Sequence, residues 1–438
     1  MGDRRGGNGR EGDRQPGLAT DRPGTAQCTC TRWDVTAPRA TVSTRGTDVL
    51  IIGAGAVGAA IAYFCAAAGL SVRVLDRGRP GGGTSSRCEG NILVSDKEHG
   101  PELDLANYSL RVWRDDLAEH SRQWGFEQKG GIIVASRESS MQSLRRALAV
   151  QRDHEIRVDE IDVQALTELE PQVTSEAVGA AWYPDDAQVM PMLVVSHLLA
   201  LARAHGAEVR GDTPALSLVR EKGRVTGVRT PIGEFRADAV VNATGPWASQ
   251  LADLAGVHLP IAPRRGYVMV TEPLPPRVFH KVYAAEYIDD VGTSDSSLQS
   301  SPVVEGTPAG SILIGSSRER VGFSDEISRE ALHLMARNAV ALFPFLADVK
   351  VLRHYHGFRP YSPDHVPVIG HDDRAAGLWH ACGHEGAGIG LSVGTGKLLA
   401  QALSGREPDL DLAPFAPARF GERPSAPEHP GVHEGASA

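Results

Sequence analysis

One stretch near the start of the folded region limits the fold most strongly. It is TDVLIIGAGAVGAAIAYFCAAAGLSVRVLDRG, residues 47–78, in which two apolar runs flank a glycine turn and an alanine-rich segment. Strand, tight turn, helix and second strand in this order are typical of a βαβ unit. The turn from Gly53 to Gly58 has the pattern G-x-G-x-x-G, whose glycines allow a tight turn, a close approach to a pyrophosphate, and helix–strand packing. The sequence therefore predicts a dinucleotide-binding unit that begins at Thr47.

The second strand of this unit ends in Asp76, about 20 residues after the turn, where a carboxylate can hold ribose hydroxyls. Asp76 argues against a ligand with a 2′-phosphate, although the neighbouring Arg77 leaves that alternative open. The unit alone does not decide between FAD and NAD. An ordinary glycine turn in a βα unit is the alternative to any nucleotide.

Three later segments favour FAD: GRPGGGTSSRCEGNI (78–92), NATGPWA (242–248) and GHEGAGIGLSVGTG (383–396). The hydroxyls and amides of the first can reach further phosphate oxygens or an isoalloxazine ring, which a diffusing nicotinamide does not need. The last offers a positive helix end for the negative charge that develops at N1–C2=O of a reduced flavin. The predicted cofactor-binding residues are Gly53, Ala54, Gly55, Ala56, Val57, Gly58, Asp76, Arg77, Thr84, Ser85, Ser86, Asn91, Ala243, Thr244, Gly245, Trp247, Gly383, His384, Gly386, Gly388 and Ile389.

The periodicity of the remaining chain predicts an α/β protein with two joined domains. A Rossmann-like FAD-binding domain is expected from three separate segments, and an inserted, mainly antiparallel α+β substrate domain from two others. Both ends of the chain are polar and rich in Gly, Pro or charge, which favours a disordered start and a loose C-terminal tail. The predicted segments are 1–46 for the disordered tail, 47–95, 190–262 and 355–405 for the FAD-binding domain, 96–189 and 263–354 for the substrate domain, and 406–438 for the loose tail.

Charge and cysteine content exclude several classes of function. The net charge of −9, without long basic runs, argues against nucleic acid as a partner. No apolar run is long enough to cross a membrane, and no signal peptide is recognisable, so we expect a cytoplasmic protein. Five cysteines, an odd number at uneven spacing, fit a reducing compartment. Cys28 and Cys30 form a CxC, but two further thiolates of an iron–sulfur cluster are missing nearby, so we expect no metal.

Five segments together give the chain a resemblance to the D-amino acid oxidase superfamily, which includes glycine oxidase and sarcosine oxidase. The segments are VLIIGAGAVGAAIAYFCAAAGLSVRVLDRG, GGTSSRCEGN, VVNATGPWA, HGFRPYSPDHVPVIG and CGHEGAGIGLSVGTGKLLA, and the resemblance covers residues 47–405. CEGNILVSDKEHGPELDLA, SSLQSSPVVEGTPAGSILIGSSRERVGF and GHEGAGIGLS look most similar to β-type catalytic subunits of multi-subunit dehydrogenases. That subgroup includes hydroxyproline dehydrogenase, opine oxidase and hydrogen cyanide synthase.

The resemblance implies roles for particular side chains. Arg359 falls where the family's arginine binds the substrate carboxylate, with pairing to a structural carboxylate such as Asp364 as the alternative. His384 either tunes protonation beside the flavin or caps the glycine loop, and Tyr283 and Tyr287 either close the pocket or belong to the core. We expect non-covalent FAD, because neither Cys88 nor Cys382 falls where sarcosine oxidases carry their flavin-linking cysteine.

The predicted function is oxidation of the C–N bond of a small amino or imino acid, by hydride transfer to flavin N5, giving an imine. The substrate classes are D-amino acids, D-proline or hydroxyproline, glycine and sarcosine. The resemblance also implies a companion iron–sulfur or second flavoprotein subunit. The alternative is an electron-relay or scaffold subunit without its own substrate chemistry, and an NAD-dependent dehydrogenase is a weaker third.

Overall fold

The computed structural model describes residues 46–154, 156–285 and 296–421. Contacts divide the chain into residues 1–42 and 43–438, and all described residues belong to the second unit. The predicted disordered tail, apart from Gly46, and its Cys28 and Cys30 lie outside the described residues, as does Tyr287. None of the helices described has both the length and the apolar character needed to cross a membrane.

The first sheet is built on the predicted βαβ unit. Its strands run in the order β17-β18-β11-β1-β2-β8, and β9 and β10 extend β11 as antiparallel strands. Strand β1 pairs in parallel with both β2 and β11, which explains its continuous apolar run, because parallel strands are covered on both faces. The strands are β1 (Thr47–Ile52), β2 (Val72–Leu75), β8 (Glu208–Arg210), β9 (Ser217–Glu221), β10 (Arg224–Thr230), β11 (Gly233–Asn242), β17 (Val368–His371) and β18 (Leu378–Cys382).

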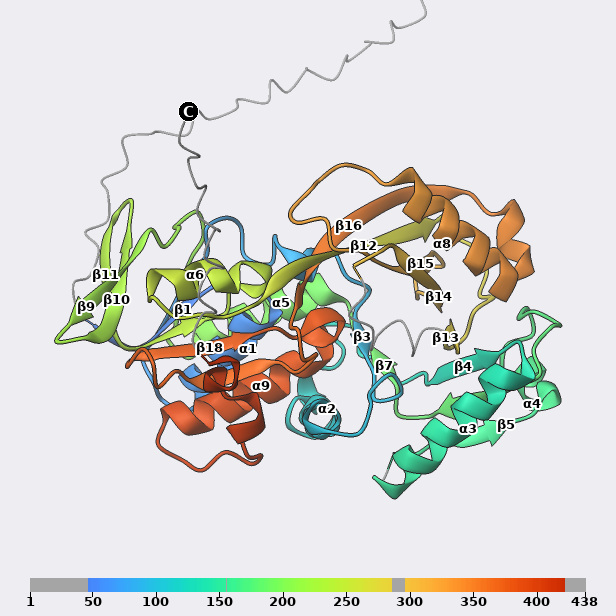
Figure 1. Ribbon diagram of the computed structural model, residues 1–438, viewed down its shortest axis with the longest axis horizontal. Coiled ribbons are helices and arrows are strands. Elements are labelled where there is room, and N and C mark those ends of the chain that lie inside the picture. Colours follow the sequence, from blue (N-terminus) through green and yellow to red (C-terminus); the bar gives the residue numbers. More distant parts are fainter. Residues whose placement is uncertain (1–45, 155, 286–295, 422–438) are drawn as a thin grey trace, which may run out of the picture. The chain divides into compact units, whose positions relative to one another are not determined.

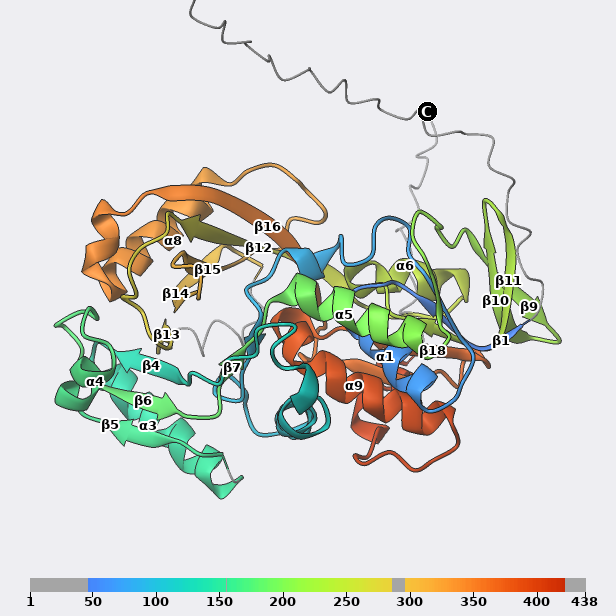
Figure 2. The same cartoon turned by 180° about the vertical axis from the view of Figure 1, so that it is seen from behind.

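The helices beside this sheet come from both ends of the described chain. Figures 1 and 2 show α1 (Ala56–Ala67) and α9 (Gly388–Leu403) side by side. Their axes approach closely because Gly396 has no side chain: a Cβ there would lie 2.7 Å from the carbonyl carbon of Ala60. The other helices here are α2 (Pro101–Arg111), α5 (Pro191–Ala204) and α6 (Ala248–Leu254).

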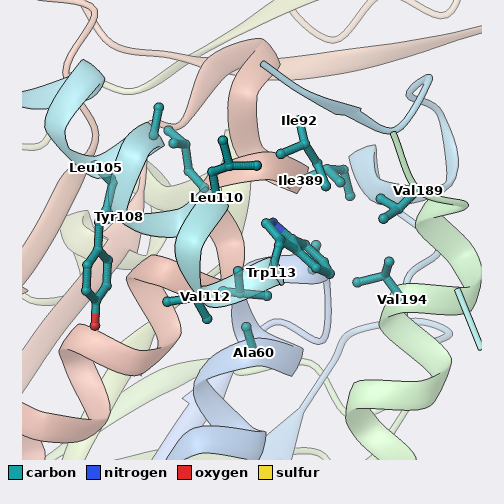
Figure 3. Packing of buried hydrophobic residues seen from close by; sticks show 14 of the residues in the cluster. Ala60, Ile92, Leu105, Tyr108, Leu110, Val112, Trp113, Val189, Val194 and Ile389 are labelled. Atoms are coloured by element: carbon teal, nitrogen blue, oxygen red, sulfur yellow. The ribbon is translucent and has the colours of Figure 1, made fainter. Parts of the chain in front are cut away.

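Trp113 fills the space between these helices. Figure 3 shows its ring among Ala60, Val194 and Ile389, which belong to the same buried cluster. Its indole Nε1 donates a hydrogen bond to the Gly390 carbonyl at 2.9 Å, so the one polar atom of the ring is satisfied. This packing fixes the start of α9, which borders the functional site.

The second sheet is mainly antiparallel, with order β16-β12-β15-β14-β13-β4-β6-β5 and one parallel pair, β13 with β4. Helices α3 (Glu138–Asp153), α4 (Val163–Leu169) and α8 (Arg329–Leu342) accompany it, and a second buried cluster lies here. Its strands are β4 (Gly131–Ala135), β5 (Asp159–Ile161), β6 (Gly179–Tyr183), β12 (Ala262–Thr271), β13 (Lys281–Ala284), β14 (Gln299–Gly306), β15 (Ile312–Arg318) and β16 (Val351–Tyr361). A short ladder joins β3 (Asn91–Ile92) to β7 (Ala187–Gln188).

This architecture confirms the predicted fold class. The predicted domain boundaries stay predictions. The tail differs from expectation up to residue 421. Residues Ala413–Phe415 and Pro417–Phe420 form short 3₁₀ helices, because Phe415 is buried in the first core and Arg419 pairs with Asp364 at 2.7 Å.

Candidate functional site

The glycine turn after β1 has the geometry that its sequence predicts. Gly53 has φ +109°, and a Cβ there would overlap the carbonyl oxygen of Ala243 on the neighbouring strand. A Cβ on Gly58 would overlap the carbonyl oxygen of Gly53, so only glycine lets the helix pack this close. Gly55 caps α1 and lines a cavity. The helix N-terminus therefore opens toward that cavity with its positive end.

Two polar side chains hold the amides of this turn. Asp76 accepts hydrogen bonds from the Ala54 amide at 2.7 Å and from the Gly78 amide at 2.9 Å. Ser85 accepts from the Ala56 amide, at the first turn of α1, at 3.0 Å. An acceptor oxygen thus already faces a helix N-terminal amide, which is where a pyrophosphate oxygen binds in dinucleotide sites.

The cavity has a volume of about 900 Å³ and is bordered by the glycine-rich segments together with strands β12, β15 and β16. Of the predicted residues, those that line it are Gly53, Gly55, Ala56, Val57, Asp76, Arg77, Thr84, Ser85, Asn91, Ala243, Thr244, Gly245, Trp247, Arg359, His384, Gly386, Gly388 and Ile389. Those that do not are Ala54, Gly58, Ser86, Gly383 and Tyr283. A bare backbone turn, a carboxylate at the end of β2 and a cavity of this volume fit FAD.

Arg77 and Trp247 form one wall of this cavity. The guanidinium carbon of Arg77 lies 3.7 Å from the centre of the Trp247 ring, and Phe323 stacks on Trp247 with ring centroids 5.2 Å apart. Arg77 is thus engaged in a cation–π contact rather than held for a 2′-phosphate.

Arg359 lies on β16 and its half-buried side chain enters the same cavity. Its Nη1 donates to the Ser317 carbonyl of β15 at 2.8 Å. A Cβ on Gly266 would overlap that nitrogen, so the absence of a side chain on β12 makes room for the guanidinium. The structural alternative, pairing with Asp364, is not seen, because Asp364 pairs with Arg419 and Ser362.

His384 is buried at the start of the segment that leads into α9, and it lines the cavity. Its Nε2 lies 3.0 Å from the hydroxyl oxygen of Thr395. Burial lowers the pKa of His384 to about 3, so the ring is neutral at ordinary pH. The contact with Thr395 favours the structural role over proton exchange.

Tyr283 does not reach the cavity. Its hydroxyl donates to Asp186 at 2.7 Å and lies in a short contact with Ser95, in the buried interior. The position of Tyr283 in the inserted segment suggested a place in the pocket. On β13, which pairs with β4, its side chain instead lies in the core. Asp186 supplies there the hydrogen-bond partner that a buried phenol needs.

Several charged residues that line the cavity were not predicted from the sequence, and Glu89 and Arg318 are two of them. Glu89 lies inside the glycine-rich loop, where a charged side chain is normally expected to be exposed to solvent. Burial raises the pKa of Glu89, and Lys281, Arg359 and Arg318 oppose that shift. Lys281 itself is buried, with short contacts to Asn91 and Glu305. No sequence signal joins these residues, because they come from different strands.

Metal-ligating groups are not clustered in the part of the chain that the structure describes: no three His, Cys, Asp or Glu side chains converge. Cys65, Cys88 and Cys382 are free thiols. Burial raises the pKa of Cys88 and of Cys382 to about 12, so both are protonated at neutral pH.

Comparisons with known proteins agree with this geometry. Residues 48–402 match the family model described as FAD dependent oxidoreductase. Hydrogen cyanide synthase subunit HcnC of Pseudomonas protegens is 28% identical, over 86% of this chain and 97% of that protein. Glycine oxidase of Pseudomonas aeruginosa is 30% identical, over 84% of this chain and 98% of that protein. The solved glycine oxidase of Geobacillus kaustophilus, 26% identical, superposes with a TM-score of 0.78 over 86% of this chain and 99% of its own. The predicted family resemblance and FAD as cofactor are confirmed.

Proposed function

We propose that this chain, which belongs to the DAO family of FAD-dependent oxidoreductases, oxidises the C–N bond of a small amino or imino acid. The observation that carries the proposal is the guanidinium of Arg359 inside the cavity that the glycine-rich segments border. A guanidinium holds a carboxylate through two parallel hydrogen bonds, which fixes both the position and the orientation of the substrate.

Several contacts support this role for Arg359. Its Nη1 donates to the Ser317 carbonyl, which holds the guanidinium at the cavity wall. Gly266 and Gly386 lie next to the side chain of Arg359, and because they are glycines they leave space for it. The relative named glycine oxidase supports an amino acid as the substrate.

The residues of the chain bind and orient the substrate. Arg359 holds the carboxylate, so that the Cα–H is presented to the ring of the cofactor. Bound FAD supplies the two-electron acceptor, and the substrate becomes an imine that water hydrolyses. The neutral ring of His384, bonded to Thr395, keeps the entry to α9 in place without exchanging protons.

A relay subunit without substrate chemistry has no need for a cationic fork in its flavin cavity, so Arg359 favours a catalytic subunit. We further propose that a companion iron–sulfur or second flavoprotein subunit takes the electrons. The support is a relative that is itself a subunit, HcnC of hydrogen cyanide synthase.

The test is anaerobic bleaching of the flavin by a panel of glycine, sarcosine, D-amino acids and cyclic imino acids. We expect at least one small amino or imino acid to reduce the flavin fully, whereas amines without a carboxylate react far more slowly. Admission of air then separates rapid oxidase turnover from slow reoxidation. A flavin that no member of the panel reduces contradicts the proposal.

A further inference from the structure

Glu89 lines the cavity, and one of its two carboxylate oxygens accepts no hydrogen bond from the described residues. It lies between the 3₁₀ turn Thr84–Ser86 and β3 (Asn91–Ile92) and lines the cavity. Its Oε2 accepts from Asn91 Nδ2 at 3.3 Å, whereas its Oε1 is buried and meets no donor among the described residues. A buried acceptor without a partner destabilises the protein. This oxygen is therefore available to a donor that enters the cavity.

The side chains of Glu89 and Arg359 both contact strand β15. Glu89 lies against Gly315, where a Cβ would overlap Oε1 of Glu89, and Arg359 Nη1 donates to the Ser317 carbonyl. Gly315 and Ser317 are separated by one residue of β15. The carboxylate and the guanidinium thus contact nearby residues of the same strand of the cavity.

Glu89 and Arg359 line one cavity and Arg359 is among the charges that act on Glu89, so a molecule that bridges them can be small. Such a molecule carries its anion and its donor close together, as the carboxylate and nitrogen of an α-amino or α-imino acid are. The terminal cation of a longer basic side chain lies several bonds farther from the α-carboxylate, so it fits this pair of groups less well.

The surroundings of Glu89 suit a proton acceptor. Charged and titratable groups act on it from all neighbouring strands: Lys281 of β13, Glu305 of β14, Arg318 of β15, and Tyr355 and Arg359 of β16, together with Cys88 in its own loop. Burial is the largest influence and raises the pKa of Glu89, while the three cations oppose the shift. A carboxylate with a raised pKa is a stronger base than an ordinary one.

We infer that Glu89 binds the amino nitrogen of the substrate and takes one proton from it, an inference that rests on the proposed function. An N–H bond of the substrate ammonium breaks, its electron pair stays on nitrogen, and the proton forms an O–H bond with Oε1. The neutral amine then has the lone pair that assists departure of the hydride from Cα. Arg359 holds the carboxylate during this exchange, so the two side chains together define the substrate class.

The test uses the FAD-loaded enzyme and the substitution Glu89→Gln, which keeps the shape and removes the negative charge. Binding is measured from the change in flavin absorbance for two matched pairs under anaerobic conditions. The pairs are glycine with acetate, and proline, in both enantiomers, with cyclopentanecarboxylate. Asp325→Asn is the control, because Asp325 borders the same cavity with a side chain that is 82% exposed and contacts His356.

We expect Glu89→Gln to retain FAD, to weaken binding of the nitrogen-bearing members by about 10- to 100-fold, and to leave their carbon analogues nearly unchanged, since a charge-assisted hydrogen bond is lost. The rate of flavin reduction in the wild type should fall as pH decreases through the titration of Glu89. In the variant this limb should be replaced by one at higher pH, where the substrate's own ammonium group is titrated.

Equal weakening of both members of each pair, or an unchanged acidic limb, would overturn the inference and leave Glu89 a structural counter-charge. Weakened binding of D-lysine alone, with glycine and proline unaffected, would overturn it in favour of a receptor for a side-chain cation. If no amino acid reduces the wild-type flavin, the proposed function fails, and the binding pairs still decide the role of Glu89.

Discussion

Replacement of Arg359 is the sharpest test of the proposed substrate site. Arg359→Ala removes the guanidinium from the cavity and its hydrogen bond to the Ser317 carbonyl, which measures 2.8 Å. Arg359→Lys keeps the positive charge but loses the planar fork. Neither change touches the glycine turn that faces the cofactor, so both variants should retain FAD.

The size of the loss follows from how deeply the guanidinium is buried. Removing one partner of a buried, hydrogen-bonded charge pair costs about 2–5 kcal/mol. Arg359 is only half-buried and the cation Arg318 remains on the cavity wall, so we expect the lower part of that range, about 2–3 kcal/mol. At about 1.36 kcal/mol per decade, kcat/KM for the amino acid should fall about 30- to 150-fold in Arg359→Ala. Arg359→Lys should lose about one decade.

The assay is anaerobic flavin reduction followed in a stopped-flow instrument, with the best substrate and with the corresponding amine that lacks the carboxylate. The loss should appear with the amino acid and largely vanish with the amine, because only the receptor for the carboxylate has been removed. Arg353→Ala is the matched control, since Arg353 is an exposed arginine of the same strand. Reduction of the flavin at an unchanged rate and affinity in Arg359→Ala would show that the arginine serves the fold alone.

Three further outcomes are expected. Gly58→Val should be purified without visible flavin absorbance, because a Cβ at this position already overlaps the Gly53 carbonyl; acid should release FAD from the wild type, and a yellow variant would contradict the tight helix–strand contact. His384→Asn should leave the shape of the pH profile between about pH 5 and 9 unchanged, because burial lowers the pKa of His384 to about 3; loss of a limb in that range would show that the ring exchanges protons. The isolated chain should reduce an artificial dye faster than it consumes oxygen, whereas rapid stoichiometric peroxide formation would indicate a simple oxidase.

Local patterns carried most of what the sequence predicts correctly. The βαβ unit involves contacts between neighbours in the chain, and its glycines have demands that no other residue meets, so Gly53 and Gly58 appear where the motif places them. The alternation and length of the later apolar runs gave a mainly antiparallel second sheet, which the structure confirms. These features follow from the period of each element, and they need no knowledge of distant partners.

Distant pairings account for what the sequence did not predict. Asn91 and Lys281 meet although 190 positions separate them, and their contact belongs to the charged surroundings of Glu89. Tyr283 is a second example. The sequence shows that a tyrosine lies in the inserted segment, but it does not show in which direction its side chain points from β13. Asp186, 97 positions away, accepts its hydrogen bond in the core. A single sequence contains no signal for either pairing.

The glycine-rich loop at residues 78–92, which follows β2, links the glycine turn at residues 53–58 to β16, the strand that carries Arg359. At one end Ser85 accepts from the Ala56 amide at the start of α1. In the same loop, Thr84 donates to the Phe358 carbonyl at 2.6 Å and Arg87 to the His356 carbonyl at 3.1 Å, both on β16. Phe358 is the neighbour of Arg359, so the loop fixes the strand that carries the guanidinium relative to α1, at whose N-terminus we expect the pyrophosphate. Hydride transfer needs a defined distance between substrate and cofactor, and this loop connects the two binding groups through three hydrogen bonds without involving the long connections between the sheets.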